Sequence, residues 1–503
     1  MISIKSFSLE KGEKSLFSDQ NLNLPKGVTA VIGPNGAGKS SFLEALMGEI
    51  PYEGQIQISG KPARLLQHEE RPDRKVSDLL AAIWSRAPEE SALINALVAP
   101  LSPESSCRDL SGGEWLRLRL SLCLAENPDW VLLDEPSNHL DREGRGLLAK
   151  FLRDWSGSVL LVSHDRELLG VAQRVLEILP GRLRLFELSA EEYFQSAREE
   201  RERRAEALDE AGRRRKKTAL ERQQDLERQE RRMAQGRRKE DRGDMPRILK
   251  GRLKRQAQQT YGKIDRGTAA RVSAADESFE QLWLSQIPEI RMRLRPEAII
   301  VSPGRRVFHA ENIRPLAPDG VSLWKRGLSF TLRGPGRWSI RGKNGSGKSL
   351  LLRLIAGAET GLSFEGTWTR SPLRASFLVQ ERSSEKDVSV LDWIREEVEI
   401  TEEELRNRLA DFGLFKESPL RLLSTLSGGE KVRASLARLM LRKDPPEILL
   451  MDEPTNDLDL ANLEALEKAL REYPGALIMI SHDDTFVKNL GAEELVNLDE
   501  LRV

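Results

Sequence analysis

The sequence predicts an α/β protein: two tandem copies of one α/β unit, joined by a charged α-helical hairpin. Three observations support this prediction. Apolar runs that suit buried strands alternate with amphipathic helical stretches at both ends of the chain. A glycine-rich motif at residue 33 returns at residue 342. A segment rich in Arg, Glu, Gln and Lys separates the copies. We expect domains at residues 1–190, 191–295 and 296–503.

Composition limits the class of protein. The 503 residues include 79 Lys or Arg and 79 Asp or Glu, so net charge alone indicates no polyanionic partner. Two cysteines, Cys107 and Cys123, are too few for a four-cysteine zinc site or a disulfide framework, which favours a reducing compartment. The N-terminus lacks an apolar signal core, and no apolar run approaches the roughly 20 residues of a membrane span. We therefore expect a soluble, cytoplasmic protein with no membrane partner.

Four short stretches in the first unit suit strands. Residues 2–4 and 55–58 alternate between apolar and polar side chains, whereas residues 130–133 and 159–162 are apolar throughout. Residues 114–126 are predicted to form a helix with a wide apolar face. Strands that alternate with helices indicate a mostly parallel sheet.

Residues 191–295 are predicted to form an arm, a helical hairpin with coiled-coil character. Three residues recur at the seven-residue spacing of a helical seam: Ala219, Leu226 and Met233. Three residues then break the pattern: Gly236, Gly243 and Pro246. A second helical stretch follows from about residue 247 to residue 283.

The arm concentrates positive charge. Residues 213–263 hold 19 Arg or Lys and seven Asp or Glu, a net charge of +12 in a neutral chain. A solvated helical linker is the simplest interpretation of such a run. The concentration of charge in an insertion between two repeated units favours contact with an RNA backbone.

Each copy carries the pattern G-x-x-x-x-G-K-[ST] between an apolar strand and a helix. The backbone N–H groups of this loop surround a polyphosphate, the lysine reaches its outer phosphates, and the final hydroxyl holds magnesium. The first loop with the start of its helix is Gly33, Pro34, Asn35, Gly36, Ala37, Gly38, Lys39, Ser40 and Ser41. The second is Gly342, Lys343, Asn344, Gly345, Ser346, Gly347, Lys348 and Ser349.

Two further motifs follow each loop. Gln67 and Gln380 each stand where a strand gives way to a loop, a position that suggests contact with magnesium or water. An L-S-G-G-E motif then opens a helix in each copy. Its serine, its glycine N–H groups and the helix N-terminus form a second anion site. An ordinary N-cap is the alternative, which the repetition at matched spacing disfavours. The residues are Ser111, Gly112, Gly113 and Glu114, and Ser427, Gly428, Gly429 and Glu430.

Two adjacent acids end a buried strand in each copy. Asp134 and Asp452 would hold magnesium, often through water. Glu135 and Glu453 would orient or activate the attacking water. A histidine follows the next buried strand, His164 in the first copy and His482 in the second, and we expect it to contact the outermost phosphate. The other three histidines are interpreted as ordinary residues: His68, His139 and His309.

This set of motifs, in this order and present twice, resembles the ATP-binding cassette superfamily. The stretches after the acids, residues 137–141 and 455–459, resemble the Thr-Asn-His-Leu-Asp stretch of the ABC-F subfamily. ABC-F proteins also have two cassettes, no membrane segment and a charged helical linker.

The resemblance implies two ATP sites with magnesium, formed when the cassettes of a monomer close head to tail. Each site would combine residues of one cassette with the L-S-G-G-E motif of the other. The first site would consist of Lys39, Ser40, Gln67, Asp134, Glu135 and His164 with Ser427 and Gly429. The second site would consist of Lys348, Ser349, Gln380, Asp452, Glu453 and His482 with Ser111 and Gly113. Both sites are predicted to hydrolyse ATP. The ATP-bound form would occupy the tRNA exit site of the ribosome, with the linker near rRNA and the P-site tRNA, and hydrolysis would release it.

The chain departs from the family pattern in two places. Cassettes usually stack adenine on an aromatic residue before the phosphate loop, but Lys11 stands there in the first copy and the second copy shows no clear aromatic. We therefore expect either loose selectivity for the base or stacking on another side chain, such as Phe17. The linker tip, residues 235–246, is short and arginine-rich, which favours a general translation role over antibiotic protection.

Two other functions remain open from the sequence. The chain could be the two-cassette energy subunit of a membrane importer, although such subunits usually have a short linker and a degenerate second signature. It could also act on branched or damaged DNA, which the basic arm would allow.

Overall fold

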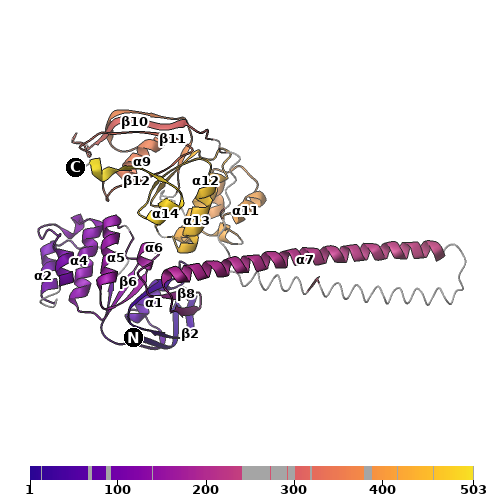
Figure 1. Ribbon diagram of the computed structural model, residues 1–503, viewed down its shortest axis with the longest axis horizontal. Helices are drawn as coiled ribbons and strands as arrows, with labels where there is room; N and C mark the ends of the chain where they lie inside the picture. Colours follow the sequence, from indigo (N-terminus) through magenta and orange to yellow (C-terminus); the bar gives the residue numbers. More distant parts are fainter. Residues whose placement is uncertain are drawn as a thin grey trace. The chain divides into compact units, whose positions relative to one another are not determined.

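The computed structural model describes residues 1–12, 14–65, 71–86, 92–138, 140–240, 272–273, 292, 299, 301–317, 320–378, 388–415, 417–456 and 458–501. It confirms the predicted fold class: the chain contains two α/β domains of similar topology and a long helix between them in sequence (Figure 1). One compact unit comprises Met1–Glu191 with Ile290–Val503, and the other is Glu192–Glu289.

A three-stranded antiparallel sheet begins the first domain. Its strands, in the order β2-β1-β4, are Lys14–Leu24, Ile2–Lys11 and Glu53–Ile58. β1 buries alternate side chains, as its sequence predicts, and a bulge between Ile4 and Phe7 restores this alternation farther along the strand. The apolar face of this sheet packs in one core with Phe42 and Leu43 of the first helix.

The second sheet of this domain places the nucleotide-binding motifs. Its six strands follow the order β5-β6-β7-β3-β8-β9, and only the pair β8 and β9 is antiparallel. The central strands β3, β6 and β7 are buried at every residue, which explains their unbroken apolar sequences. The strands are β5 Pro62–Leu65, β6 Trp130–Asp134, β7 Ser158–Val162, β3 Val28–Ile32, β8 Arg174–Leu179 and β9 Arg182–Phe186.

Helices connect these strands. They are α1 Lys39–Leu46, α2 Val76–Trp84, α3 Ala92–Val98, α4 Gly112–Ala125, α5 Arg142–Asp154 and α6 Arg166–Leu169, with a 3-10 turn at Cys107–Asp109. α4 corresponds to the predicted helix at residues 114–126, and it buries Leu116, Leu118 and Leu120.

The second domain repeats this plan. Its antiparallel sheet has the order β11-β10-β13, and its parallel sheet the order β14-β15-β16-β12-β17. The strands are β10 Arg305–Leu316, β11 Leu328–Gly334, β12 Arg337–Arg341, β13 Ser363–Arg370, β14 Ala375–Leu378, β15 Ile448–Asp452, β16 Ala476–Ile480 and β17 Glu493–Asn497. The helices are α9 Lys348–Ala356, α10 Val390–Arg395, α11 Glu402–Ala410, α12 Gly428–Met440, α13 Leu460–Glu472 and α14 Asp484–Asn489, with 3-10 turns at Ser418–Leu420, Leu423–Thr425 and Leu498–Leu501.

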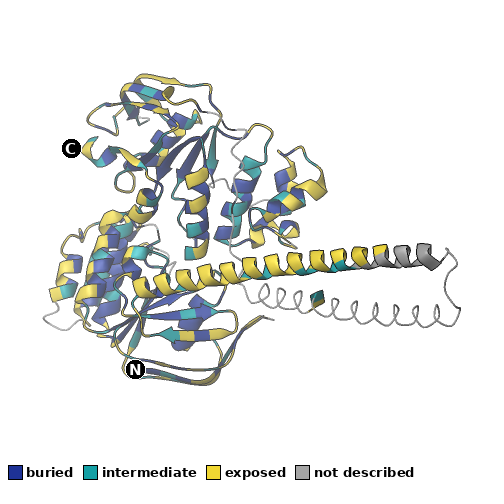
Figure 2. Ribbon diagram, turned by 45° about the vertical axis from the view of Figure 1, so that its right-hand side comes forward, coloured by how far each residue is buried: buried dark blue, intermediate teal, exposed yellow. Residues whose placement is uncertain are grey.

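Helix α7, Ala190–Glu240, forms the first half of the predicted arm. Its described side chains are mostly exposed (Figure 2). Ala219 is exposed, while Ala211, Thr218 and Asp225, also seven residues apart, are partly buried. The helix continues through Gly236, so the predicted break does not occur there. Apart from residues 272–273, the predicted second helix lies outside the described residues, as do Gly243 and Pro246.

Candidate active site

The two phosphate loops have the same geometry. Each connects the end of a buried strand to a helix, β3 to α1 and β12 to α9. Gly36 and Gly345 adopt left-handed backbone conformations, with φ of 76° and 74°. No atom lies within 4 Å of the position that a Cβ would take on either glycine. Each loop therefore has open space beside its second glycine.

The loop lysines are buried and point into their own loops. Lys39 Nζ donates to the carbonyl oxygens of Gly33 at 2.8 Å and Pro34 at 3.3 Å. Lys348 Nζ donates to those of Gly342 at 2.7 Å and Lys343 at 3.0 Å. Burial lowers the pKa of both lysines. Each ammonium group thus lies at the place that the motif assigns to the phosphate-binding cation.

An aromatic ring supports each loop from the core. A Cβ on Gly38 would lie 3.2 Å from Phe17 Cζ, and one on Gly347 would lie 3.3 Å from the Trp324 Nε1 atom. Trp324 Nε1 also donates to the carbonyl oxygen of Ser346 at 2.9 Å. Phe17 and Trp324 are fully buried, so neither can stack on a base. The suggestion that Phe17 replaces the adenine-stacking aromatic is therefore wrong, because its ring is part of the domain core.

Ser40 and Asp134 can form the magnesium site of the first copy. Ser40 Oγ donates to Asp134 Oδ1 at 3.2 Å, and Asp134 is buried at the end of β6. A hydroxyl and a carboxylate side by side are the hard oxygen donors that magnesium prefers, so the residues fit the ion. Within the described part of the chain, no three His, Cys, Asp or Glu side chains gather into a metal-binding cluster. Gln67 and Gln380, the other predicted ligands, lie outside the described residues.

Arg64 contacts the same carboxylate, and sequence reasoning missed it. Arg64 Nη2 lies 3.3 Å from Asp134 Oδ2, and its side chain is only 6 % exposed. It also pairs with Glu49 at 2.5 Å and with Glu44 at 3.8 Å. A comparison of the two copies could have revealed it, since Phe377 occupies the matching position, three residues before Gln380.

The L-S-G-G-E serines are N-caps. Ser111 Oγ accepts from Glu114 N at 3.2 Å, and Glu114 Oε2 accepts from Ser111 N at 2.8 Å. Ser427 and Glu430 form the same capping box, at 3.3 and 2.9 Å. The N-cap alternative therefore describes the local structure of both motifs correctly. A capped helix N-terminus still presents its remaining N–H groups and its positive end, so the predicted anion site stays a prediction.

Each predicted catalytic glutamate lies beside its predicted histidine. Glu135 Oε1 is 3.2 Å from His164 Nε2, and Glu453 Oε1 is 3.3 Å from His482 Nε2. Both glutamates have left-handed backbones, with φ of 45° and 49°, a strained conformation for a residue with a side chain. His164 Nε2 and Glu453 Oε1 are buried without a hydrogen bond to any described residue. Unsatisfied buried polar atoms in this position suit a water or a phosphate oxygen as partner.

Burial sets the protonation of these groups. It raises the pKa of Glu453 to about 7. It lowers the pKa of His482 to about 4 and, with the Lys39 ammonium, that of His164 to about 3. Both histidines are therefore neutral at physiological pH, whereas Glu453 changes charge near pH 7.

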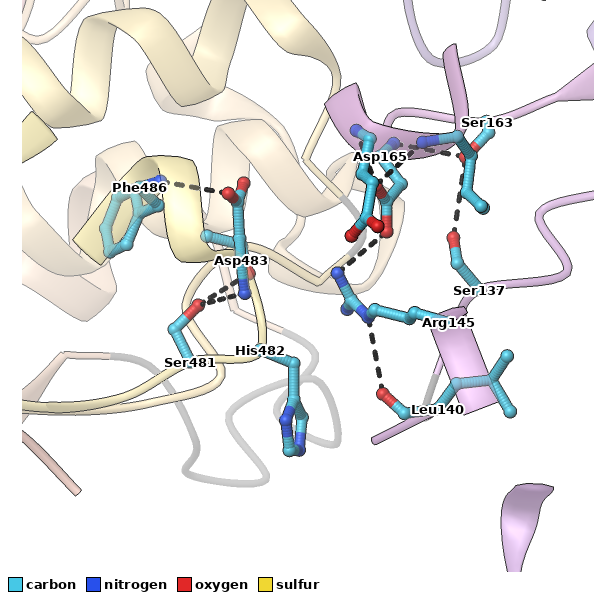
Figure 3. Close-up of polar contacts among 12 residues, drawn as sticks. Ser137, Leu140, Arg145, Ser163, Asp165, Ser481, His482, Asp483 and Phe486 are labelled. Atoms are coloured by element: carbon cyan, nitrogen blue, oxygen red, sulfur yellow. Dashed lines mark hydrogen bonds and ion pairs between the residues drawn. The ribbon is translucent and has the colours of Figure 1, made fainter. Parts of the chain in front are cut away.

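A serine and an aspartate fix the turn that carries each histidine (Figure 3). Ser163 Oγ accepts from Asp165 N, and Ser481 Oγ accepts from Asp483 N, both at 3.1 Å. The aspartates then cap the helices that follow, α6 and α14. The S-H-D sequence thus positions the histidine through local hydrogen bonds.

Arg145 of α5 adds a positive charge that sequence reasoning also missed. Its Nη1 donates to Asp165 Oδ2 at 2.9 Å, and its Nε donates to the carbonyl oxygen of Leu140 at 3.4 Å (Figure 3). Its charge opposes the rise that burial causes in the pKa of Glu453, and it adds to the fall that burial causes in the pKa of His482, both in the other domain. The corresponding residue of α13 is the buried Leu463.

The two α/β domains contact each other within their compact unit. Asn35 N donates to Asp459 Oδ2 at 3.3 Å, and Lys343 Nζ lies 2.7 Å from Glu143 Oε2. Each phosphate loop thus contacts the start of the helix that follows the paired acids of the opposite domain. A partly buried ion pair, Arg166 with Glu467 at 2.7 Å, adds a third contact.

Comparison with known proteins decides the family. A protein-family model described as ABC transporter matches this chain twice, over residues 17–138 and 326–456. The chain belongs to the ATP-binding cassette family.

Its relatives are ABC-F proteins, as the motifs predicted. The ATP-binding protein Uup of Buchnera aphidicola (subsp. Acyrthosiphon pisum) is 28% identical over 97% of this chain and 79% of its own length. The ribosome protection protein VmlR of Bacillus subtilis is 28% identical over 99% and 86%, and the energy-dependent translational throttle protein EttA of Mycobacterium tuberculosis is 29% identical over 95% and 87%.

A solved structure shares the tandem-cassette fold. The protein titled RNase-L Inhibitor superposes with a TM-score of 0.58 at 18% identity, covering 97% of this chain and 86% of that one. Among the residues that the structure describes, none of the helices combines the length and the apolar character that a membrane crossing requires.

Proposed function

We propose that this tandem-cassette protein is an ATP hydrolase that binds the ribosome in its ATP-closed form and is released by hydrolysis. The observation that supports the proposal is the repeated pairing of a buried loop lysine with a glutamate–histidine pair, in a chain similar to proteins named for the ribosome and for translation. VmlR is titled a ribosome protection protein, and EttA a translational throttle protein. Such a role places the protein in the cytoplasm, at the tRNA exit site.

Each site would bind ATP through residues with separate tasks. The loop N–H groups and Lys39 or Lys348 bind the phosphates, and the adjacent Ser40 or Ser349 contributes its hydroxyl to the magnesium site. Asp134 or Asp452 completes that site. Bound magnesium would neutralise charge that develops on the transferred phosphate. The two L-S-G-G-E motifs would close the sites from the opposite cassette.

The glutamate accepts a proton from the attacking water, and the neutral histidine beside it contacts the outermost phosphate. We infer that both sites hydrolyse ATP, since both dyads are intact. Their distances of 3.2 and 3.3 Å and their backbone angles are nearly the same. Neither copy has lost the base.

The arm would contact RNA. Near its start, α7 pairs its arginines with acids one turn away, as in Arg198 with Glu202 and Arg203 with Glu199. From residue 213 onward basic residues exceed acidic ones, and Arg214, Lys216 and Lys217 are exposed. An excess of exposed cations on an extended helix suits the phosphate backbone of rRNA or tRNA.

The test uses the double substitution Glu135→Gln and Glu453→Gln, which should retain ATP binding and block hydrolysis. We expect the variant to co-sediment with purified ribosomes through sucrose only when ATP is present. Deletion of residues 213–263 from the same variant should abolish this co-sedimentation, while its ATP binding persists.

A hydrolysis-deficient protein that binds ATP but stays at the top of the gradient would refute the ribosomal function. Parallel sedimentation with membrane vesicles and with branched DNA would then test the importer and DNA alternatives. The control is the variant Lys39→Ala with Lys348→Ala, which should bind neither ATP nor ribosomes.

A further inference from the structure

Arg64 distinguishes the two ATP sites. It lies on β5, where it pairs in register with Leu132 of β6. Phe377 of β14 pairs in the same way with Leu450 of β15, so the two residues are structurally equivalent. A permanent positive charge in the first site thus corresponds to a neutral ring in the second.

The Arg64 guanidinium contacts Asp134, the carboxylate that the magnesium site requires. Asp134 Oδ2 lies 3.3 Å from Arg64 Nη2, while Asp134 Oδ1 accepts from Ser40 Oγ. Asp134 is 2% exposed and the Arg64 side chain 6%, so water screens this pair poorly. A second cation at the same carboxylate must either displace the guanidinium or accept its repulsion.

Two glutamates contact the same guanidinium that contacts Asp134. Arg64 Nη1 lies 2.5 Å from Glu49 Oε2, and Nη2 lies 3.8 Å from Glu44 Oε1. The Glu49 side chain is 45% exposed, so this anchor lies at the surface end of the contact. The second copy has neither acid, because Arg353 and Ala358 stand at the equivalent positions. The cluster of Arg64, Glu44 and Glu49 therefore has no counterpart at the equivalent positions of the second copy.

We propose that Arg64 is an internal counter-ion of Asp134 that competes with magnesium, so that the first ATP site needs more magnesium than the second. The proposal rests on the ATPase function proposed above. Arginine suits this role because it remains charged at any physiological pH and its forked donors can hold Asp134 and a glutamate together. Binding of magnesium with ATP would shift the guanidinium onto Glu44 and Glu49.

The experiment measures nucleotide binding at one site at a time in the full-length chain. Lys348→Ala leaves the first site to bind fluorescent N-methylanthraniloyl-ATP, and Lys39→Ala leaves the second. Magnesium is titrated at fixed nucleotide, and the concentration for half-maximal binding is recorded. In the first-site background, Arg64→Met should lower this concentration about tenfold, since a buried cation next to the ligand is removed. Affinity at saturating magnesium should stay unchanged.

Two controls address structure and specificity. In the second-site background, Arg64→Met and Phe377→Met should each leave the magnesium requirement unchanged. Because Arg64→Met leaves Asp134 without its partner and could impair folding, a surface variant gives an independent test. Glu49→Gln removes the outer anchor, holds the guanidinium on Asp134, and should raise the magnesium requirement of the first site.

An unchanged magnesium requirement in both Arg64→Met and Glu49→Gln would refute the proposal. So would a loss of affinity at every magnesium concentration, which would mean that Arg64 binds the nucleotide directly. A parent chain that binds no nucleotide at all would refute the ATPase function itself, and the Arg64 proposal with it. Competition between the guanidinium and magnesium predicts opposite shifts for the two variants.

Discussion

Glu453 should impose a pH dependence on hydrolysis at its own site. Burial raises the pKa of its carboxyl to about 7, against the opposing charges of Arg145 and Lys348. A general base must be ionised to accept a proton. At pH 6 only about one-tenth of the molecules would carry the ionised base, against about nine-tenths at pH 8. The neighbouring His482 has a pKa of about 4, so it stays neutral over this range and cannot cause the change.

The assay uses Glu135→Gln, which leaves hydrolysis to the Glu453 site. We expect kcat/KM for ATP, followed by phosphate release, to fall about tenfold for each pH unit below about 7. Because the terminal phosphate of ATP also titrates, binding of a non-hydrolysable analogue is measured over the same range and divided out. The matched variant Glu453→Gln should lose this acid limb. A corrected rate that stays level from pH 8 to about pH 5.5 would refute the role of Glu453 as a buried base.

Two further predictions concern stability, both measured by thermal unfolding. A Cβ on Gly33 would lie 2.0 Å from the backbone oxygen of Ile178, so Gly33→Ala should lower the melting temperature strongly and abolish ATP binding. Gly36 has open space around it, so Gly36→Ala should cost only about 1 kcal/mol of stability, because of its left-handed backbone. Similar melting temperatures for the two variants would contradict the loop geometry. The pKa of Glu453 is raised from 4.5 to about 7, so the folded state loses up to about 3 kcal/mol as pH rises through this window. Glu453→Gln should therefore melt at a higher temperature than the parent at pH 8 but not at pH 4.5, and equal melting at pH 8 would show that burial does not strain the carboxylate.

Features encoded by neighbouring residues were predictable from the sequence. The phosphate loops, the paired acids and the S-H-D turns each depend on a few consecutive residues, and repetition of every motif showed that they belong together. The strands before them were equally clear, because β3, β6 and β7 are buried on both faces and are therefore wholly apolar.

Features that depend on tertiary contact gave no signal in their own segment of the sequence. Phe17 precedes the first phosphate loop in the sequence. Only the packing of the antiparallel sheet shows that its ring is buried next to Gly38 and not at the surface. Arg64 and Asp134 are 70 residues apart and meet because β5 and β6 are adjacent in the sheet. From the sequence alone, a charged residue on a strand is expected to face the solvent. The residues around Arg64 therefore gave no indication that it is buried against Asp134.

The duplication has preserved the residues predicted to act on the nucleotide and has changed some of those around them. The loop lysines bond the matching carbonyl oxygens in both copies, and the glutamates lie at nearly the same distance from their histidines. By contrast, Arg64 corresponds to Phe377 and Arg145 to Leu463. Both differences place an added cation on the first copy, yet they act on different sites. Arg64 contacts Asp134, the carboxylate proposed to bind magnesium in its own cassette. The charge of Arg145 opposes the rise that burial causes in the pKa of Glu453 in the other cassette. We therefore expect two sites with the same predicted catalytic residues to differ in their magnesium requirement for ATP binding, and the Glu453 site to depend on pH near 7.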